Sequence, residues 1–155
     1  MVEYKALNNE LSLYVEERLL INLYEVSMKF YPNEYGGILL GHYSENRDFL
    51  SITGTILPFS FKSSKEGFTR GAAGLQNELA TIASIKPLTK YVGEWHTHPD
   101  TPAIPSPTDK VAMKNIANDP DCSILNPVLL IISTTKTCFK IKFYVQYENQ
   151  LYPFE

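Results

Sequence analysis

The chain has 155 residues, and its 14 Lys and Arg against 17 Asp and Glu give a formal net charge of -3 at pH 7. A hydrophobic fraction of 44% and a charged fraction of 20% are ordinary for a globular protein, and the length predicts one domain, residues 1–155, with a sizeable core. The acidic balance argues against a nucleic-acid partner, which would select a basic surface. No apolar run approaches the ~18 residues of a membrane span, and the N-terminus lacks the basic and apolar start of a secretory signal. We therefore expect a cytoplasmic protein without a membrane partner.

The first part of the chain predicts two short strands, an amphipathic helix and two longer strands. Apolar residues at steps of three and four indicate the helix, and Pro32 and Asn33 end it. The next strand has three glycines, at positions 36, 37 and 41, which favour a close approach to the backbone, with a β-bulge or tight helix packing as the alternative. In order, the segments are strands 2–7 and 10–14, helix 15–30, and strands 35–43 and 49–57.

The second part predicts a long polar loop and then alternating helices and strands. The loop is long enough to have a function of its own. The run 127–134 is apolar throughout, as in a strand buried on both faces. In order, the segments are loop 58–70, helix 71–86, strand 90–97, helix 106–117, and strands 127–134, 137–146 and 150–154. The fold class is therefore α/β, with a single mixed β-sheet flanked by helices.

Two side-chain predictions accompany these segments. Helix 106–117 is expected to bury Val111, Ala112 and Ile116, with Met113 a further core candidate. Cys122 and Cys138 are isolated thiols outside any CxxC spacing, so we interpret them as reduced and structural.

The stretch 93–109 holds the residues with the most specific chemistry. His96 and His98 are two apart, so on a strand they point to the same face, roughly 6.5–7 Å apart. A Pro-rich loop then returns the chain to Asp109. Two imidazoles and one carboxylate form the ligand set of a catalytic zinc, because the fourth position stays free for water. Taken singly, these residues are ordinary: Ser106 before Pro107 is typical of a helix N-cap, and Asp109 would then lie in the first helical turn.

The spacing His96-x-His98, seven residues, Ser106, two residues, Asp109 resembles the signature of the JAMM (MPN-plus) metalloproteases, which cleave ubiquitin-like proteins from their conjugates. That family also needs an upstream glutamate near a glycine-rich strand, and Glu34 in the run Asn33 to Gly41 matches it. The resemblance implies the three-layer MPN fold, which is similar to that of cytidine deaminases.

The resemblance also implies a mechanism. His96, His98 and Asp109 would hold one zinc ion per chain, and the ion would lower the pKa of its bound water towards ~7. Glu34 would take the proton and pass it to the leaving amine, while the Ser106 hydroxyl would donate to the oxyanion. His42 lies outside the signature and is interpreted as a structural or surface residue. Trp95 would face away from the two histidines, into the core.

The implied substrate is an amide bond after the C-terminal tail of a ubiquitin-like protein, or in a conjugated target protein. The sequence around Glu34 and His96 looks most like that of prokaryotic JAMM peptidases, including those of CBASS antiphage operons. There, a cyclic-oligonucleotide synthase is released from its conjugate. Three alternatives stay open at this stage. They are processing of a sulfur-carrier protein with a ubiquitin-like fold, a non-catalytic MPN scaffold, and an unrelated zinc hydrolase that acts on small amides.

Overall fold

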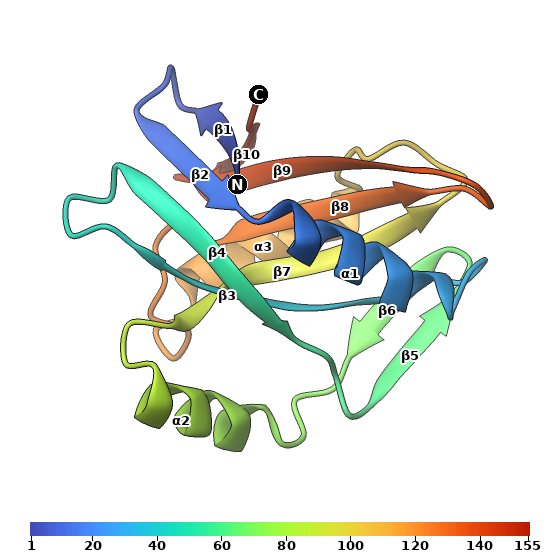
Figure 1. The fold of residues 1–155 in the computed structure, drawn as a ribbon, viewed down its shortest axis with the longest axis horizontal. Helices are drawn as coiled ribbons and strands as arrows, with labels where there is room; N and C mark the ends of the chain where they lie inside the picture. The colour runs from blue at the N-terminus through green and yellow to red at the C-terminus, as the bar shows by residue number, and fades with distance from the viewer.

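The computed structural model describes residues 1–155, which form one large sheet, a small hairpin and helices on both sides of the large sheet (Figure 1). The helices are α1 (Glu17–Met28), α2 (Leu75–Ile85) and α3 (Pro107–Asn118). The strands are β1 (Val2–Ala6), β2 (Leu11–Val15), β3 (Gly36–Tyr43), β4 (Phe49–Ile56), β5 (Phe61–Ser64), β6 (Gly67–Arg70), β7 (Lys90–Pro99), β8 (Val128–Thr134), β9 (Phe139–Tyr147) and β10 (Gln150–Pro153).

The large sheet has eight strands in the order β1-β2-β4-β3-β7-β8-β9-β10. It is mixed: β2 runs parallel to β4 and β7 runs parallel to β8, whereas the remaining neighbours are antiparallel. Lys5 and Glu155 exchange two backbone hydrogen bonds, of 2.9 and 2.8 Å, so the two edges of the sheet meet. The sheet is therefore curled almost into a barrel, which leaves little free edge for association. The predicted fold class is confirmed.

The two faces of β8 pack against different helices, which explains its continuous apolar sequence. Leu130 and Ile132 belong to the main core together with Leu20 and Leu23 of α1. Leu129 and Ile131 point the other way and pack with Met113 of α3. Because side chains alternate along a strand, α1 and α3 cover opposite faces of the sheet. The sequence-based prediction of a doubly buried strand is thus confirmed.

The predicted loop 58–70 is wrong, because this segment contains the two-stranded hairpin β5–β6. Each strand has only four residues, and β5 is mostly exposed whereas β6 is mostly half-buried, so no apolar alternation marks them in the sequence. The helix predicted from 71 begins at Leu75, since Gly74 adopts a left-handed φ of 75° directly before it. No residue of α2 is fully buried; its apolar side chains pack at the surface of a small cluster formed by Ile38, Leu40 and Ile56.

The predicted core face of α3 is also partly wrong. Met113 is buried, Ile116 is half-buried, and Val111 and Ala112 are exposed. Met113 is the only fully buried residue of α3, so the helix contacts the sheet along a narrow stripe. Both cysteines are free, as predicted, but neither is a core residue: Cys122 is half-buried and Cys138 is exposed.

The glycines of β3 are associated with both a β-bulge and a close backbone approach, two of the roles that the sequence suggested. The register of β3 against β4 shifts between Leu40 and Gly41, which marks a β-bulge. A Cβ atom on Gly41 would collide with the backbone oxygen of Ser51 on β4, so the close approach requires glycine. No helix in the structure is long and apolar enough to cross a bilayer.

The central position of β8 predicts a strong dependence of stability on its side chains. We expect Leu130→Ala, which removes a side chain with 0% exposure, to lower the free energy of unfolding by about 2–5 kcal/mol. The matched control Val111→Ala, at a position 60% exposed, is expected to change it by less than about 0.5 kcal/mol. Denaturant titration of both variants measures the difference, and equal losses would contradict this description of the core.

Candidate metal centre

The strand β7 lies in the middle of the sheet and sends alternate side chains to the two sides. Trp95 is buried in the main core, where its indole N–H donates to Thr55 Oγ1 at 2.9 Å. Thr97 is buried as well. His96 and His98 point to the other side, towards α3, as the period of two requires. The interpretation of Trp95 as a core residue that faces away from the histidines is confirmed.

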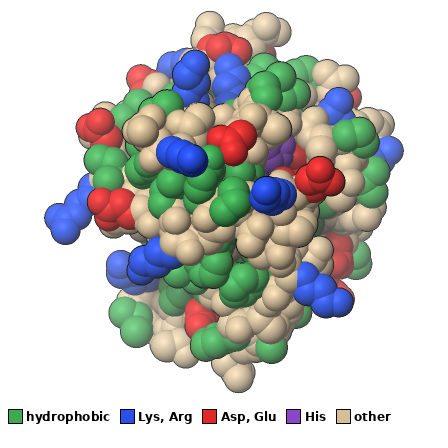
Figure 2. All heavy atoms as spheres, turned by 90° about the vertical axis from the view of Figure 1, so that its right-hand side faces the viewer, with side chains coloured by type: hydrophobic (Ala, Val, Ile, Leu, Met, Phe, Trp, Pro, Cys, Tyr) green, Lys and Arg blue, Asp and Glu red, His purple; other side chains and the backbone are tan.

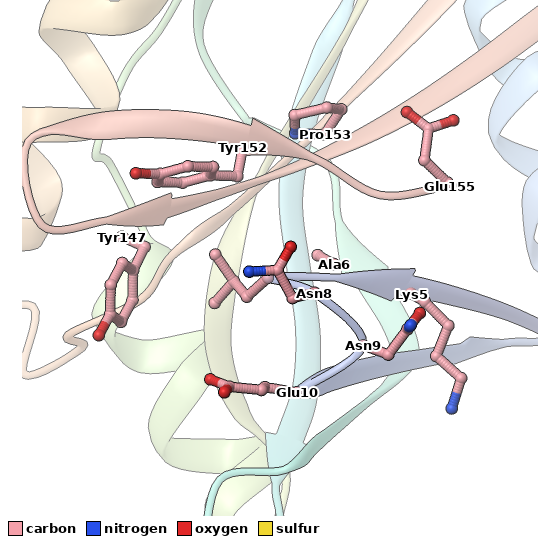
Figure 3. Close-up of a pocket in the computed structure, with 10 residues that line it drawn as sticks. Lys5, Ala6, Asn8, Asn9, Glu10, Tyr147, Tyr152, Pro153 and Glu155 are labelled. Atoms are coloured by element: carbon pink, nitrogen blue, oxygen red, sulfur yellow. The ribbon is translucent and has the colours of Figure 1, made fainter.

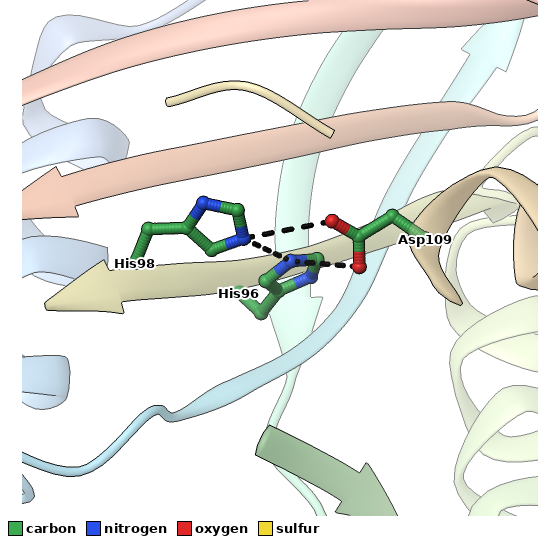
Figure 4. A group of neighbouring side chains, drawn as sticks. All are labelled: His96, His98 and Asp109. Atoms are coloured by element: carbon green, nitrogen blue, oxygen red, sulfur yellow. Dashed lines mark hydrogen bonds and ion pairs between the residues drawn. The ribbon is translucent and has the colours of Figure 1, made fainter. Parts of the chain in front are cut away.

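The structure brings His96, His98 and Asp109 together, with their ligand atoms all within 4.8 Å of one another (Figure 4). The two histidine Nε2 atoms are 3.2 Å apart. Asp109 Oδ1 lies 3.2 Å from His96 Nε2, and Asp109 Oδ2 lies 3.5 Å from His98 Nε2. The histidine side chains are 13% and 11% exposed, so the cluster is largely buried but keeps some contact with solvent. Figure 2, which shows the right-hand side of Figure 1, has histidine atoms recessed between charged and apolar side chains.

The loop after β7 sets the orientation of His98. Its Nδ1 lies 3.0 Å from the carbonyl oxygen of Pro102, which can only accept, so Nδ1 carries the proton that is donated. In neutral His98 the lone pair of Nε2 then points at His96 and at the Asp109 carboxylate. A hydrogen bond of this kind to the second ring nitrogen is typical of metal-binding histidines. The sequence could not reveal the role of Pro102, because the contact is made by its backbone.

The N-terminus of α3 fixes the third side chain of the cluster. Asp109 N–H donates to Ser106 Oγ at 3.1 Å, and Ser106 N–H donates to Asp109 Oδ2 at 2.8 Å, which is a reciprocal capping box. The predicted N-cap at Ser106 is confirmed. The box holds the Asp109 carboxylate so that its other oxygen faces His96.

Glu34 reaches the same side of the sheet through the pairing of β3 with β7. Gly36 lies opposite His96 in the ladder, and the N–H of Thr97 donates to the carbonyl of Tyr35 at 2.8 Å. Glu34 is two residues before Gly36, so the same alternation directs its side chain to the face of His96 and His98, and its carboxyl group interacts with the charges of both histidines. A Cβ atom on Gly36 would collide with Trp95 O and His96 Cβ, so only glycine allows this pairing beside the ligand.

The charges of the cluster favour a positive charge between His96, His98 and Asp109. Burial raises the pKa of Asp109, but the hydrogen bonds with His96 and His98 outweigh it, and the net pKa lies well below the usual range. Burial lowers the pKa of His98, yet its bonds with Asp109 and Pro102 O raise the net value. Burial also raises the pKa of Glu34, which His96 and His98 partly oppose. Without an ion, a proton fills this role. With one, two imidazole nitrogens and a carboxylate suit a divalent transition metal with an open position.

Two other features lie outside the cluster. His42 is near the opposite end of β3, where it faces Phe49 edge-on at 6.5 Å between ring centroids. A separate pocket of about 510 Å³ lies between the β1–β2 turn and the β9–β10 hairpin (Figure 3). None of the residues that line this pocket belongs to the metal cluster, and Lys5, its one cation, is engaged with Glu3 and Ser12 at 2.6 and 2.7 Å.

The capping box makes a measurable contribution to stability. We expect Ser106→Ala to lower the free energy of unfolding of the metal-free protein by about 1 kcal/mol, because the N–H of Asp109 loses its acceptor. Ser106→Asn, which also caps a helix well, should recover most of that loss. Chemical denaturation of the three proteins tests this; an unchanged Ser106→Ala would mean that the box is not formed in solution.

Comparison with known proteins agrees with this geometry. The family described as prokaryotic homologs of the JAB domain matches residues 16–144. The CD-NTase/cGAS isopeptidase of Enterobacter hormaechei subsp. hoffmannii (strain UCI 50) is 40% identical over 101 residues, which cover 64% of this chain and 55% of that protein. The match therefore spans only about half the length of that relative.

The solution structure of protein DSY2949 from Desulfitobacterium hafniense superposes with a TM-score of 0.64 over 91% of this chain and 88% of that one, at 21% identity, which shows a shared fold. Since the family match covers most of the sequence, the chain belongs to the prokaryotic JAB-domain family.

Proposed function

We propose that this protein is a zinc-dependent isopeptidase or peptidase that hydrolyses the amide bond after the C-terminal tail of a ubiquitin-like protein or in its conjugate. The observation that carries the proposal is the convergence of His96, His98 and Asp109, with the carboxyl group of Glu34 close enough to interact with their charges. All the polar residues that the JAMM signature needs are present in this chain. A non-catalytic scaffold would have no requirement for the full set.

The residues would divide the work as follows. His96, His98 and Asp109 would hold the zinc, which supplies Lewis acidity and lowers the pKa of a bound water to about 7. Glu34, whose pKa burial raises, would accept a proton from water and return it to the leaving amine. The Ser106 oxygen accepts from Asp109 N–H, so its hydroxyl hydrogen is free to donate to the developing oxyanion. Loss of one such donor typically costs about 10²–10³ in kcat.

A polypeptide substrate fits the surroundings of the cluster better than a small amide. The segment 100–104, whose Pro102 carbonyl holds His98, also forms one wall of a surface groove of about 730 Å³. The opposite wall comes from β9 and includes Phe139, Ile141 and Tyr144. We infer that this surface groove receives an extended polypeptide, since its walls come from a loop and a strand at the surface of the molecule.

The relative from Enterobacter hormaechei suggests the conjugate. It is named a CD-NTase/cGAS isopeptidase, and it is 40% identical to this chain over the matched region. We infer that the substrate here is an amide-linked conjugate of a CD-NTase, a cyclic-oligonucleotide synthase, in a bacterial antiphage system. Processing of a sulfur-carrier protein with a ubiquitin-like fold is the second candidate, because it would use the same site.

Removal of the base and removal of a ligand should separate catalysis from metal binding. We expect one zinc per chain in the wild type and in Glu34→Gln, and a marked loss of zinc in His98→Ala. Turnover of a CD-NTase conjugate should fall by about 10²–10⁴ in Glu34→Gln, the range for loss of a general base. His42→Ala, which removes a histidine outside the cluster, serves as the control and should keep both zinc and activity. Metal analysis and gel-based cleavage measure these outcomes.

The outcomes discriminate between the candidates. Cleavage of a sulfur-carrier fusion but not of the CD-NTase conjugate would transfer the assignment to the second candidate. Full activity in Glu34→Gln would remove Glu34 from the mechanism. A wild-type protein that binds no zinc after incubation with the metal would contradict the proposed function.

Zinc binding should weaken as the pH falls. The pKa of His98 in the folded, metal-free protein is raised above its ordinary value of about 6.5, so His98 holds its proton up to higher pH. Metal must displace that proton, and the apparent zinc affinity should therefore be lower at pH 6 than at pH 8. Calorimetric titration in buffers of different ionisation enthalpy would detect the released proton. Equal affinity at the two pH values would contradict this account of His98.

A further inference from the structure

Glu34 lies in the short segment between α1 and β3, whereas the other residues of the candidate site come from β7 and from the N-terminal end of α3. A general base must stay within about 2.6–3.2 Å of the proton that it takes. A misplacement of about 1 Å can cost roughly 10²-fold in rate. The backbone of this segment therefore needs a specific means of being held in place.

The hairpin β5–β6 provides that support through two consecutive residues. The N–H of Glu34 donates to the carbonyl of Ser64 at 2.8 Å. The hydroxyl of Ser63 donates to the carbonyl of Glu34. Both backbone groups of Glu34 are thus held by β5, a strand that lies outside the eight-stranded sheet.

The hairpin is itself firmly attached to the main body. Phe61 and Phe68 pack against the ring of Tyr35, with centroid distances of 5.2 and 5.8 Å. At the end of β6, Arg70 forms a bidentate ion pair with Glu94 of β7, with distances of 2.6 and 2.9 Å. These contacts join the hairpin to Tyr35 and, independently of the Glu34 segment, to β7, so it can hold Glu34 rather than follow its motion.

The two serines differ in a way that isolates the hydroxyl. Ser63 is half-buried, and its side chain bonds to Glu34. Ser64 is exposed; its side chain bonds only within the hairpin, and its contact with Glu34 uses the backbone carbonyl, which any residue retains. A substitution at Ser64 therefore preserves the support, whereas removal of the Ser63 hydroxyl releases the Glu34 carbonyl.

We propose that Ser63 is a positioning residue: its hydroxyl, presented by the β5–β6 hairpin, fixes the peptide of Glu34 and so holds the carboxyl on the side of the histidines. This inference rests on the proposed function for its effect on turnover. Its structural part concerns the backbone of Glu34 and can be tested in the metal-free protein.

The test compares Ser63→Ala with the matched control Ser64→Ala and with Ser63→Thr, which keeps a hydroxyl and suits a strand. Ser63→Ala is expected to lower kcat by about 10-fold with little change in KM or zinc content, because the misplaced base affects only the chemical step. In metal-free protein, hydrogen exchange followed by NMR should show faster exchange of the Glu34 and Tyr35 amides. Ser64→Ala should match the wild type in every readout, and Ser63→Thr should recover most of kcat and of the amide protection.

The outcomes separate this inference from the function on which it rests. If Ser63→Ala keeps wild-type kcat and wild-type exchange at Glu34 and Tyr35, the positioning role is wrong. A loss of zinc or a change in KM equal to that in kcat would also overturn it, because the hydroxyl would then act on the fold as a whole. If the wild type cleaves no conjugate, the proposed function fails, and the exchange measurement still decides whether Ser63 holds Glu34.

Discussion

The pairing of β3 with β7 is the constraint on which the candidate site depends. It places Gly36 opposite His96 and, two residues earlier in the chain, brings Glu34 to the same face as both histidines. The pairing is possible because Gly36 has no side chain to meet the backbone of Trp95 and the Cβ of His96. The same strand, β7, runs parallel to β8 on its other side, whose buried side chains fix it in the centre of the sheet. The histidines are therefore presented by one of the best-packed parts of the molecule.

The geometry of the polar cluster is consistent with a metal site and contributes little to stability by itself. Two histidine nitrogens 3.2 Å apart, with a carboxylate at 3.2 and 3.5 Å, gain little from one another unless a cation or a proton lies between them. The surrounding backbone fixes this arrangement: Pro102 O orients His98, and the capping box orients Asp109. Both devices act on the outer side of the ligand and leave the atoms that would face a metal free.

The helices α1 and α3 and the β5–β6 hairpin contribute differently to the core and to the candidate site. The main core lies between α1 and the sheet, while α3 contributes Met113 to a smaller cluster and Asp109 to the site. The β5–β6 hairpin adds nothing to the main core; its contacts are with Tyr35, Glu94 and the backbone of Glu34. Stability and placement of the candidate base thus rest on different parts of the chain, which allows one to change without the other.

Much of the candidate site could be predicted from the sequence because its signals are local. The spacing of His96 and His98 fixes their common face on any strand, and Ser106 before Pro107 predicts the helix start that carries Asp109. The apolar run of β8 predicted a strand buried on both faces for the same reason. Resemblance to a known signature, rather than any local rule, connected Glu34 to these residues.

Other features depended on contacts between distant segments, and no local pattern determines those. The hairpin β5–β6 has short, mostly polar strands that look like a loop in the sequence, and it forms because the backbone of Glu34 and an aromatic cluster provide its contacts. Val111 was expected inside and lies outside, because the position of α3 on the sheet decides which of its residues are covered. The proton on His98 Nδ1 is placed by a backbone carbonyl four residues away, and side-chain identity says nothing of where that carbonyl points. The sequence by itself determined which ligands are available and on which face they lie; only the tertiary structure decided how they are oriented and what holds Glu34, because both depend on backbone groups from separate elements.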